Sequence, residues 1–163
     1  AKCAVELSKI YGADPSKAEA AGILHDVAKF FEIPRMLDLV RGKYPEIENK
    51  IFWTNAILHG FAGAEFVAKN YDLFEVDDDD IFSAIKYHTI GSENMTTLPK
   101  IIYLADAIEE KRDWDGVETA RKLAKEDLDL AIKFEIDRKL EYLLERDSVI
   151  HPNIIKFRNS ILK

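Results

Sequence analysis

Apolar residues recur every three or four positions along most of the chain, which is the spacing of helices that bury one face. A helix is predicted over residues 3–11, where Gly12 ends it, and a second begins after Asp14 and continues over 15–29. Further helices are predicted over residues 34–41, 54–67, 81–88, 98–112, 116–125, 128–146 and a short segment after 152. Sustained two-residue alternation, typical of half-buried strands, is absent from the sequence. The pattern therefore predicts an all-α fold.

Two segments just before predicted helices carry residues that could have a function. The acidic run Asp77–Asp80 precedes the apolar segment "IFSAIKYH", and acidic side chains favour a helix N-terminus. A calcium loop would need a glycine and a distal glutamate at fixed spacing, so we interpret the run as a helix cap. His151 stands directly before Pro152 and is interpreted as a surface or helix-entry residue.

Composition restricts the classes of protein to consider. The 163 residues, 47% hydrophobic and 33% charged, fit one globular domain, so residues 1–163 are treated as a single domain. The one cysteine excludes an intramolecular disulfide and favours a cytoplasmic location. No apolar run approaches the roughly 20 residues that span a bilayer, so we expect no membrane partner. The net charge of −7 disfavours polymeric nucleic acid, and small anionic ligands remain as candidates.

Several ionisable residues interrupt the apolar stripes. The doublet His25-Asp26 stands in "GILHDVAKF", and His59, His88 and Asp106 each lie within an apolar helical stripe or at its end. Any one of them is explained by hydrogen bonding in the core. Together they would be costly to bury without partners, and one shared metal would serve them all. Imidazole and carboxylate ligands suit zinc, iron or manganese in a hydrolytic centre.

These residues resemble a known family. "LHD" with a distant "LAD" resembles the HD superfamily of metal-dependent phosphohydrolases, which has an all-helical fold. A finer resemblance covers about 120 residues: "AGILHDVAK", "HGFAGAEFVAK", "AIKYHTIGSENMTTLPKIIYLADAIEEKR" and "GVETARKLAKEDLDLAI". This ordered set is similar to the YqeK-type branch, bacterial symmetrical dinucleoside tetraphosphatases.

The resemblance implies a reaction and a set of site residues. The substrate would be diadenosine tetraphosphate, cut at its central bridge into two ADP, and the metal would be iron, with manganese or zinc as alternatives. The implied metal ligands are His25, Asp26 and Asp106, and His59 and His88 would hold a second metal or the phosphate chain. The implied nucleotide-binding residues are Lys29, His59, His88, Thr89, Gly91 and Arg112.

This constellation predicts a mechanism. A metal held by His25, Asp26 and Asp106 would make hydroxide available at neutral pH, and Asp26 could also orient or deprotonate the attacking water. Lys29, together with Arg112, would stabilise charge on the phosphoryl oxygens. Lys29 is expected on the same helical side as the doublet. His88 is expected to donate a proton to the leaving diphosphate.

One departure from the family pattern leaves alternatives open. The superfamily's first metal-binding histidine lies about thirty residues before the doublet, and that position falls before Ala1; the first helix is therefore expected to lack its N-terminal part. The alternatives are the same chemistry on a deoxynucleotide, guanosine tetraphosphate or cyclic dinucleotide, and a module that binds metal and nucleoside diphosphate without hydrolysis. The apolar C-terminal helices leave room for a homodimer.

Overall fold

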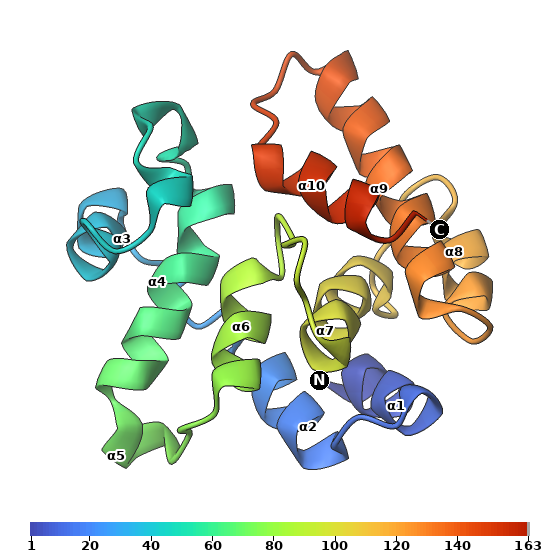
Figure 1. The fold of residues 1–163 in the computed structure, drawn as a ribbon, viewed down its shortest axis with the longest axis horizontal. Helices are drawn as coiled ribbons and strands as arrows, with labels where there is room; N and C mark the ends of the chain where they lie inside the picture. Colours follow the sequence, from blue (N-terminus) through green and yellow to red (C-terminus); the bar gives the residue numbers. More distant parts are fainter. Residues whose placement is uncertain (163) are drawn as a thin grey trace.

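The chain folds into helices from end to end (Figure 1). The computed structural model describes residues 1–162, which contain ten α-helices, two short 3₁₀ helices and no β-strand, so the all-α prediction is confirmed. The 3₁₀ helices are Pro45–Ile47 and Lys50–Phe52. The α-helices are α1 (Lys2–Tyr11), α2 (Pro15–Leu24), α3 (Ile33–Val40), α4 (Asn55–Lys69), α5 (Tyr71–Phe74), α6 (Asp79–Tyr87), α7 (Thr97–Ile108), α8 (Val117–Leu123), α9 (Leu128–Glu145) and α10 (Pro152–Ser160).

Helix-end signals of the sequence act locally as predicted. Gly12 ends α1 in the left-handed conformation, with φ of 70°. The Asp14 carboxylate accepts hydrogen bonds from the first backbone amides of α2. In the acidic run, Asp78 caps α6 by accepting from the amides of Asp80 and Ile81. The interpretation of residues 77–80 as a helix cap is confirmed.

The second helix ends earlier than predicted. α2 stops at Leu24, and residues 25–30 form turns held by bonds of i→i+3 type, such as Lys29 N–H to the Asp26 carbonyl at 2.9 Å. The expectation that His25, Asp26 and Lys29 lie along one helix is therefore wrong. The doublet stands on a turn, which allows both of its side chains to face the same space.

Close packing of α4 on α6 brings two predicted site residues together. A Cβ at Gly60 would lie 2.6 Å from the Lys86 carbonyl oxygen, so only glycine permits this approach of the two backbones. His59 precedes Gly60 on α4, and His88 follows the last residue of α6. Figure 1 shows α4 and α6 side by side, with α7 next to α6.

The C-terminal helices cover the other side of α7. α9 packs against α7, and α10 packs against α9 (Figure 1). The ring centroid of Phe157 on α10 lies 5.2 Å from that of Tyr103 on α7. His151 caps α10 and is only 2% exposed, so helix entry was predicted correctly and a surface position was wrong. None of the helices within residues 1–162 is both long and apolar enough to span a membrane.

Candidate metal centre

Five ionisable side chains converge where the turn after α2 meets α4, α6 and α7. They are His25 and Asp26 on the turn, His59 on α4, His88 at the end of α6 and Asp106 on α7. These are the residues that interrupt the apolar stripes of the sequence. The fold brings all five together.

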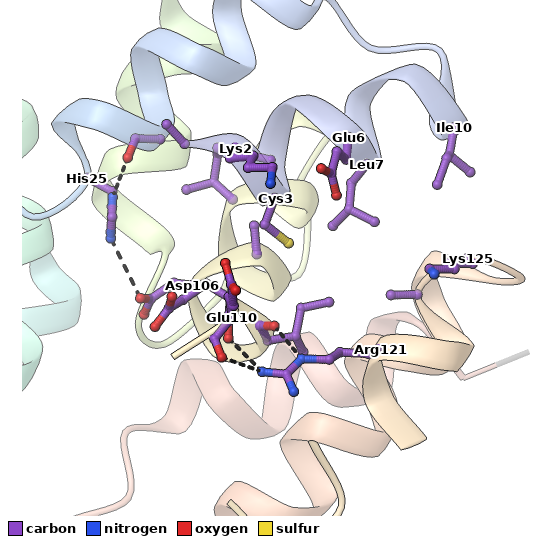
Figure 2. Close-up of a pocket in the computed structure, with 18 residues that line it drawn as sticks. Lys2, Cys3, Glu6, Leu7, Ile10, His25, Asp106, Glu110, Arg121 and Lys125 are labelled. Atoms are coloured by element: carbon purple, nitrogen blue, oxygen red, sulfur yellow. Dashed lines mark hydrogen bonds and ion pairs between the residues drawn. The ribbon is translucent and has the colours of Figure 1, made fainter. Parts of the chain in front are cut away.

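Asp26 lies at the centre of this cluster. Its Oδ1 is 3.2 Å from Nε2 of His59 and 3.5 Å from Nε2 of His88. Its Oδ2 is 3.6 Å from Nε2 of His25, which is also 3.6 Å from Oδ1 of Asp106. Figure 2 shows this last contact, with His25 reaching across to Asp106.

The three imidazole rings are oriented by the backbone. His25, His59 and His88 each place Nδ1 2.7–3.0 Å from a carbonyl oxygen three or four residues earlier. Because a carbonyl only accepts, each Nδ1 carries a proton and donates it. In the neutral rings, Nε2 is therefore a bare lone pair, and all three lone pairs face the cluster.

Burial and charge act in opposite directions on the two aspartates. Burial would raise the pKa of the Asp26 carboxyl, but its contacts with two histidines and with Lys29 hold that pKa well below its usual range. Burial would likewise raise the pKa of Asp106, and His25 together with the Arg112 guanidinium lowers it. Both carboxylates are ionised at neutral pH.

His88 is the most buried member, with 2% of the residue exposed. Burial lowers its pKa and outweighs the opposing contact with Asp26. A neutral His88 can act as a metal ligand, and its role as proton donor to the leaving diphosphate stays a prediction. Its Nε2 lies only 2.9 Å from Nε2 of His59.

The donor set fits a metal cation. Two bare imidazole lone pairs 2.9 Å apart, both facing a carboxylate, repel one another unless a cation lies among them. Donor atoms of His25, Asp26 and His88 all lie within 4.8 Å of one another. The Asp26 oxygens lie 3.6 Å from Nε2 of His25 and 3.5 Å from Nε2 of His88, separations that two metal bonds of about 2.0–2.2 Å can span. Nitrogen and oxygen donors of this kind suit zinc, iron and manganese.

Two cations border the cluster. Lys29 Nζ lies 2.6 Å from Oδ2 of Asp26, and Arg112 donates from Nη2 to Oδ1 of Asp106 at 2.5 Å. Both side chains are about two-fifths exposed, so each has donors that can turn toward a ligand in the pocket. Arg121 holds the loop that carries Arg112 by donating to the carbonyls of Glu109 and Arg112 at 2.7 and 2.9 Å. Figure 2 shows Arg121 in a neighbouring pocket of about 560 Å³.

A larger pocket of about 830 Å³ opens from the cluster toward α9 and α10. Among the predicted nucleotide-binding residues, it is lined by Lys29, His59, His88, Thr89 and Arg112. The Thr89 hydroxyl is buried, and within residues 1–162 nothing hydrogen-bonds to it.

Gly91, which was predicted to bind nucleotide, has a packing role in the structure, and its contact with nucleotide stays a prediction. It lies outside the pocket wall formed by residues 1–162. Its φ is 68°, and a Cβ there would fall 2.1 Å from the Phe157 ring. Glycine at position 91 is therefore required by the contact between its loop and α10.

The α9 wall of the pocket was missed by the sequence reasoning. Glu135 and Lys139 line it, and they stand four residues apart on α9. A Glu–Lys pair at this spacing is typical of exposed helix faces. The sequence offered one indirect signal for this wall, Tyr103, which stands three residues before Asp106 on α7. In the structure, the Tyr103 hydroxyl accepts a hydrogen bond from Lys139 Nζ at 2.7 Å.

Comparisons with known proteins agree with the motifs. The HD domain family matches residues 1–111. The chain is 39% identical over 159 residues to the "Bis(5'-nucleosyl)-tetraphosphatase, symmetrical" of Halalkalibacterium halodurans, covering 98% of this chain and 83% of the relative. The protein of the same name from Bacillus subtilis is 38% identical over 154 residues, covering 92% and 78%.

A solved structure is similar as well. It is the crystal structure of a predicted HD superfamily hydrolase involved in NAD metabolism from Clostridium acetobutylicum, with 36% identity and a TM-score of 0.89. The match covers 98% of this chain and 83% of that one. The chain therefore belongs to the HD-domain family and, within it, to the group whose members are named symmetrical bis(5'-nucleosyl)-tetraphosphatases.

Proposed function

We propose that the chain hydrolyses diadenosine tetraphosphate at its central phosphoanhydride, giving two ADP. The observation that carries the proposal is the cluster of imidazole and carboxylate donors at the wall of a pocket of about 830 Å³, with Lys29 and Arg112 beside it. Metal ligands and phosphate-binding cations in one pocket are the requirements of phosphoryl transfer to water. The names of the two relatives support the substrate class.

Each residue receives a role from its position. His25, Asp26 and Asp106 would hold the metal, and His59 and His88 would bind a second metal or the phosphate chain. A bound metal would supply acidified water for attack on phosphorus. Asp26 would orient that water, and Lys29 and Arg112 would stabilise charge on the phosphoryl oxygens because their donors already point into the cluster.

Finer features of the proposal rest on the family resemblance and on composition. The metal is iron, in keeping with the nitrogen and oxygen donors of the cluster. Residues 1–163 form one HD domain, in which α9 packs on the matched region through α7. The protein acts in a bacterial cytoplasm and binds no polymeric nucleic acid, and its apolar C-terminal helices leave room for a homodimer.

A product assay tests the reaction. Full-length protein loaded with iron, or with manganese, is incubated with diadenosine tetraphosphate, and the nucleotides are separated by ion-exchange chromatography. We expect ADP alone. AMP with ATP would contradict cleavage at the centre, and binding of metal and ADP without any hydrolysis would identify a non-catalytic module. Faster turnover of a deoxynucleotide, guanosine tetraphosphate or a cyclic dinucleotide would assign the site to another substrate.

Variants test the assigned ligands. Asp26→Asn and Asp106→Asn are expected to lower hydrolysis at least about 100-fold, because groups that merely orient metal ligands already contribute about 10–100-fold. Elemental analysis should show metal loss in the same variants. Asp38→Asn is the matched control, since Asp38 is an exposed aspartate on α3 that forms an ion pair with Arg41. Unchanged hydrolysis in metal-replete Asp26→Asn protein would contradict the assignment.

A further inference from the structure

The pocket of about 830 Å³ has an aromatic ring at its wall that stays open to solvent. The tyrosine and tryptophan side chains of this wall are Tyr103, Trp114 and Tyr142. Tyr103 is buried, and Trp114 is held by a hydrogen bond from its Nε1 to the Ala107 carbonyl at 2.7 Å. Tyr142 lies on α9 and is 54% exposed. Of these three side chains, Tyr142 is therefore the most accessible to a ligand.

Apolar residues line the same side of the pocket as Tyr142. Leu143 follows it on α9, the exposed Val149 lies between α9 and α10, and Ile154 lies on α10. An apolar surface that remains exposed within a concave site is typical of a ligand-binding groove. The wall formed by α9 and α10 therefore suits a flat, weakly polar part of a ligand.

The other end of the pocket suits phosphates. Lys29 and Arg112 form ion pairs with Asp26 and Asp106, the carboxylates that a bound metal would engage. Metal binding would therefore free both cations to contact phosphate oxygens. The pocket-lining cations of α9 are instead paired with carboxylates of the same helix. A nucleotide whose phosphates lie at the metal cluster thus directs its nucleoside toward α9 and α10.

Arg146 supports the ring of Tyr142. It is the C-cap of α9, and its guanidinium carbon lies 4.5 Å from the centroid of the Tyr142 ring. A cation over an aromatic face is attracted to the π electrons of the ring. This contact orients the ring from one side and leaves its opposite face for a ligand. A nucleobase is the part of a nucleotide that complements such a face, because stacking requires no hydrogen-bond partner.

We propose that Tyr142 is the base-stacking residue of the pocket: its ring stacks on the base of the nucleotide whose phosphates lie at the metal cluster. This inference rests on the proposed function for the presence of a nucleotide. Stacking tolerates every base, because each base has a π face. Tyr142 therefore favours ligands that carry a nucleoside over inorganic polyphosphate, without distinguishing adenine from guanine.

Binding measurements test the proposal without relying on hydrolysis. Calorimetry on metal-loaded full-length protein compares ADP, GDP and inorganic pyrophosphate. Tyr142→Leu should bind ADP and GDP each about tenfold more weakly than the wild-type protein, which is within the range for one stacked base. Its affinity for pyrophosphate should equal that of the wild-type protein. Tyr142→Phe keeps the ring and should retain wild-type affinity for all three ligands.

Tyr71→Leu is the matched control, because Tyr71 lies on α5, is 52% exposed and is not part of the pocket wall formed by residues 1–162. It should leave all three affinities unchanged. Thermal unfolding checks that Tyr142→Leu folds. If it does not, Tyr142→Gln takes its place with the same expectation, since glutamine also lacks a ring and favours a helix.

Three results would overturn the proposal: unchanged nucleotide affinity in Tyr142→Leu, an equal loss for nucleotides and pyrophosphate, or a loss confined to one of the two nucleotides. An equal loss in Tyr142→Phe would overturn it too, because it would assign the effect to the hydroxyl, as would absence of ADP binding to the wild-type protein. By contrast, ring-dependent binding of ADP and GDP without hydrolysis of the tetraphosphate would refute the proposed function and support the role of Tyr142.

Discussion

Two lysines form ion pairs of similar length, and one of them borders the candidate metal centre. Lys29 Nζ lies 2.6 Å from Asp26, and its side chain is 43% exposed. Lys17 Nζ lies 2.5 Å from Asp78, with 42% exposure. Ion pairs as exposed as these contribute little to folding, because solvent screens the charges, so neither lysine is needed for stability.

Because Lys17 is paired and exposed to the same extent as Lys29, it serves as a control for the role of Lys29. We expect Lys29→Met to lower kcat/KM for diadenosine tetraphosphate about 100-fold, the effect of losing one donor to developing charge. Lys17→Met should leave kcat/KM unchanged. Steady-state kinetics and thermal unfolding of both variants check the prediction. Similar activity losses, or a large fall in stability with Lys29→Met, would show that the lysine is structural.

At the residue scale, the sequence predicts which ionisable side chains cluster better than it predicts which residues line the pocket wall. His25, His59, His88 and Asp106 could be grouped because ionisable side chains in apolar stripes require a shared partner. Glu135 could not be recognised, because a Glu–Lys pair four residues apart is usually solvated. Its burial depends on α7 packing against α9, which is a tertiary contact. The chemical roles of the grouped residues stay predictions until they are measured.

At the element scale, most helices were predictable from periodicity and caps, and the end of α2 was not. Residues 25–30 form i→i+3 turns that keep Asp26 and Lys29 in contact, as a continued helix also would. A single turn of apolar spacing does not distinguish the two conformations. The 3₁₀ segments between residues 45 and 52 were missed because such short elements have no periodicity of their own.

Two glycines on α4 make the packing of α4 against α6 testable. A Cβ at Gly60 would meet the Lys86 carbonyl oxygen at 2.6 Å, whereas one at Gly63 would meet a methyl group of Ile85 at 3.2 Å. Backbone cannot yield as a side chain can, so Gly60→Ala should destabilise the protein by about 1–3 kcal/mol. Gly63→Ala should cost less. Urea unfolding measures both, and equal costs would contradict this view of the interface.

His151 connects α10 to the 3₁₀ segment at residues 45–47. Its Nε2–H donates to the Glu46 carbonyl at 2.8 Å, and its Nδ1 accepts from the Asn153 amide at 3.1 Å. Burial lowers its pKa from the ordinary value of 6.5, and nearby Lys156 acts in the same direction. The unfolded chain therefore binds a proton that the folded chain does not. Stability is full above pH 6.5 and falls as the pH decreases below it.

The variant His151→Asn isolates this contribution, because asparagine can cap α10 and does not titrate. At neutral pH we expect a loss of about 1 kcal/mol for the missing bond to Glu46. Between about pH 7.5 and 5.5 the variant should lose less stability than the wild-type protein. The stability that the variant still loses arises partly from His88, whose pKa burial also lowers. Urea unfolding of metal-free protein at both pH values provides the comparison. Identical pH dependence in the two proteins would exclude this role for His151.

At the scale of the whole molecule, the candidate centre joins four segments that are distant in sequence: the turn after α2, α4, the end of α6, and α7. A cation bound to all of them stabilises the folded chain and not the unfolded one. Metal at about 100 times its Kd contributes about 2.7 kcal/mol. For a chain of this length, that raises the unfolding midpoint by about 5–10 °C.

Scanning calorimetry with Mn²⁺ or with a chelator measures this shift. Because the histidines bind metal only when neutral, the shift should shrink at about pH 5.5. Asp26→Asn should abolish it, since Asp26 contacts all three histidines of the cluster, and the exposed control Asp38→Asn should retain it. Equal stabilisation of Asp26→Asn and wild-type protein would mean that Mn²⁺ binds elsewhere and that the five clustered side chains are not the metal centre.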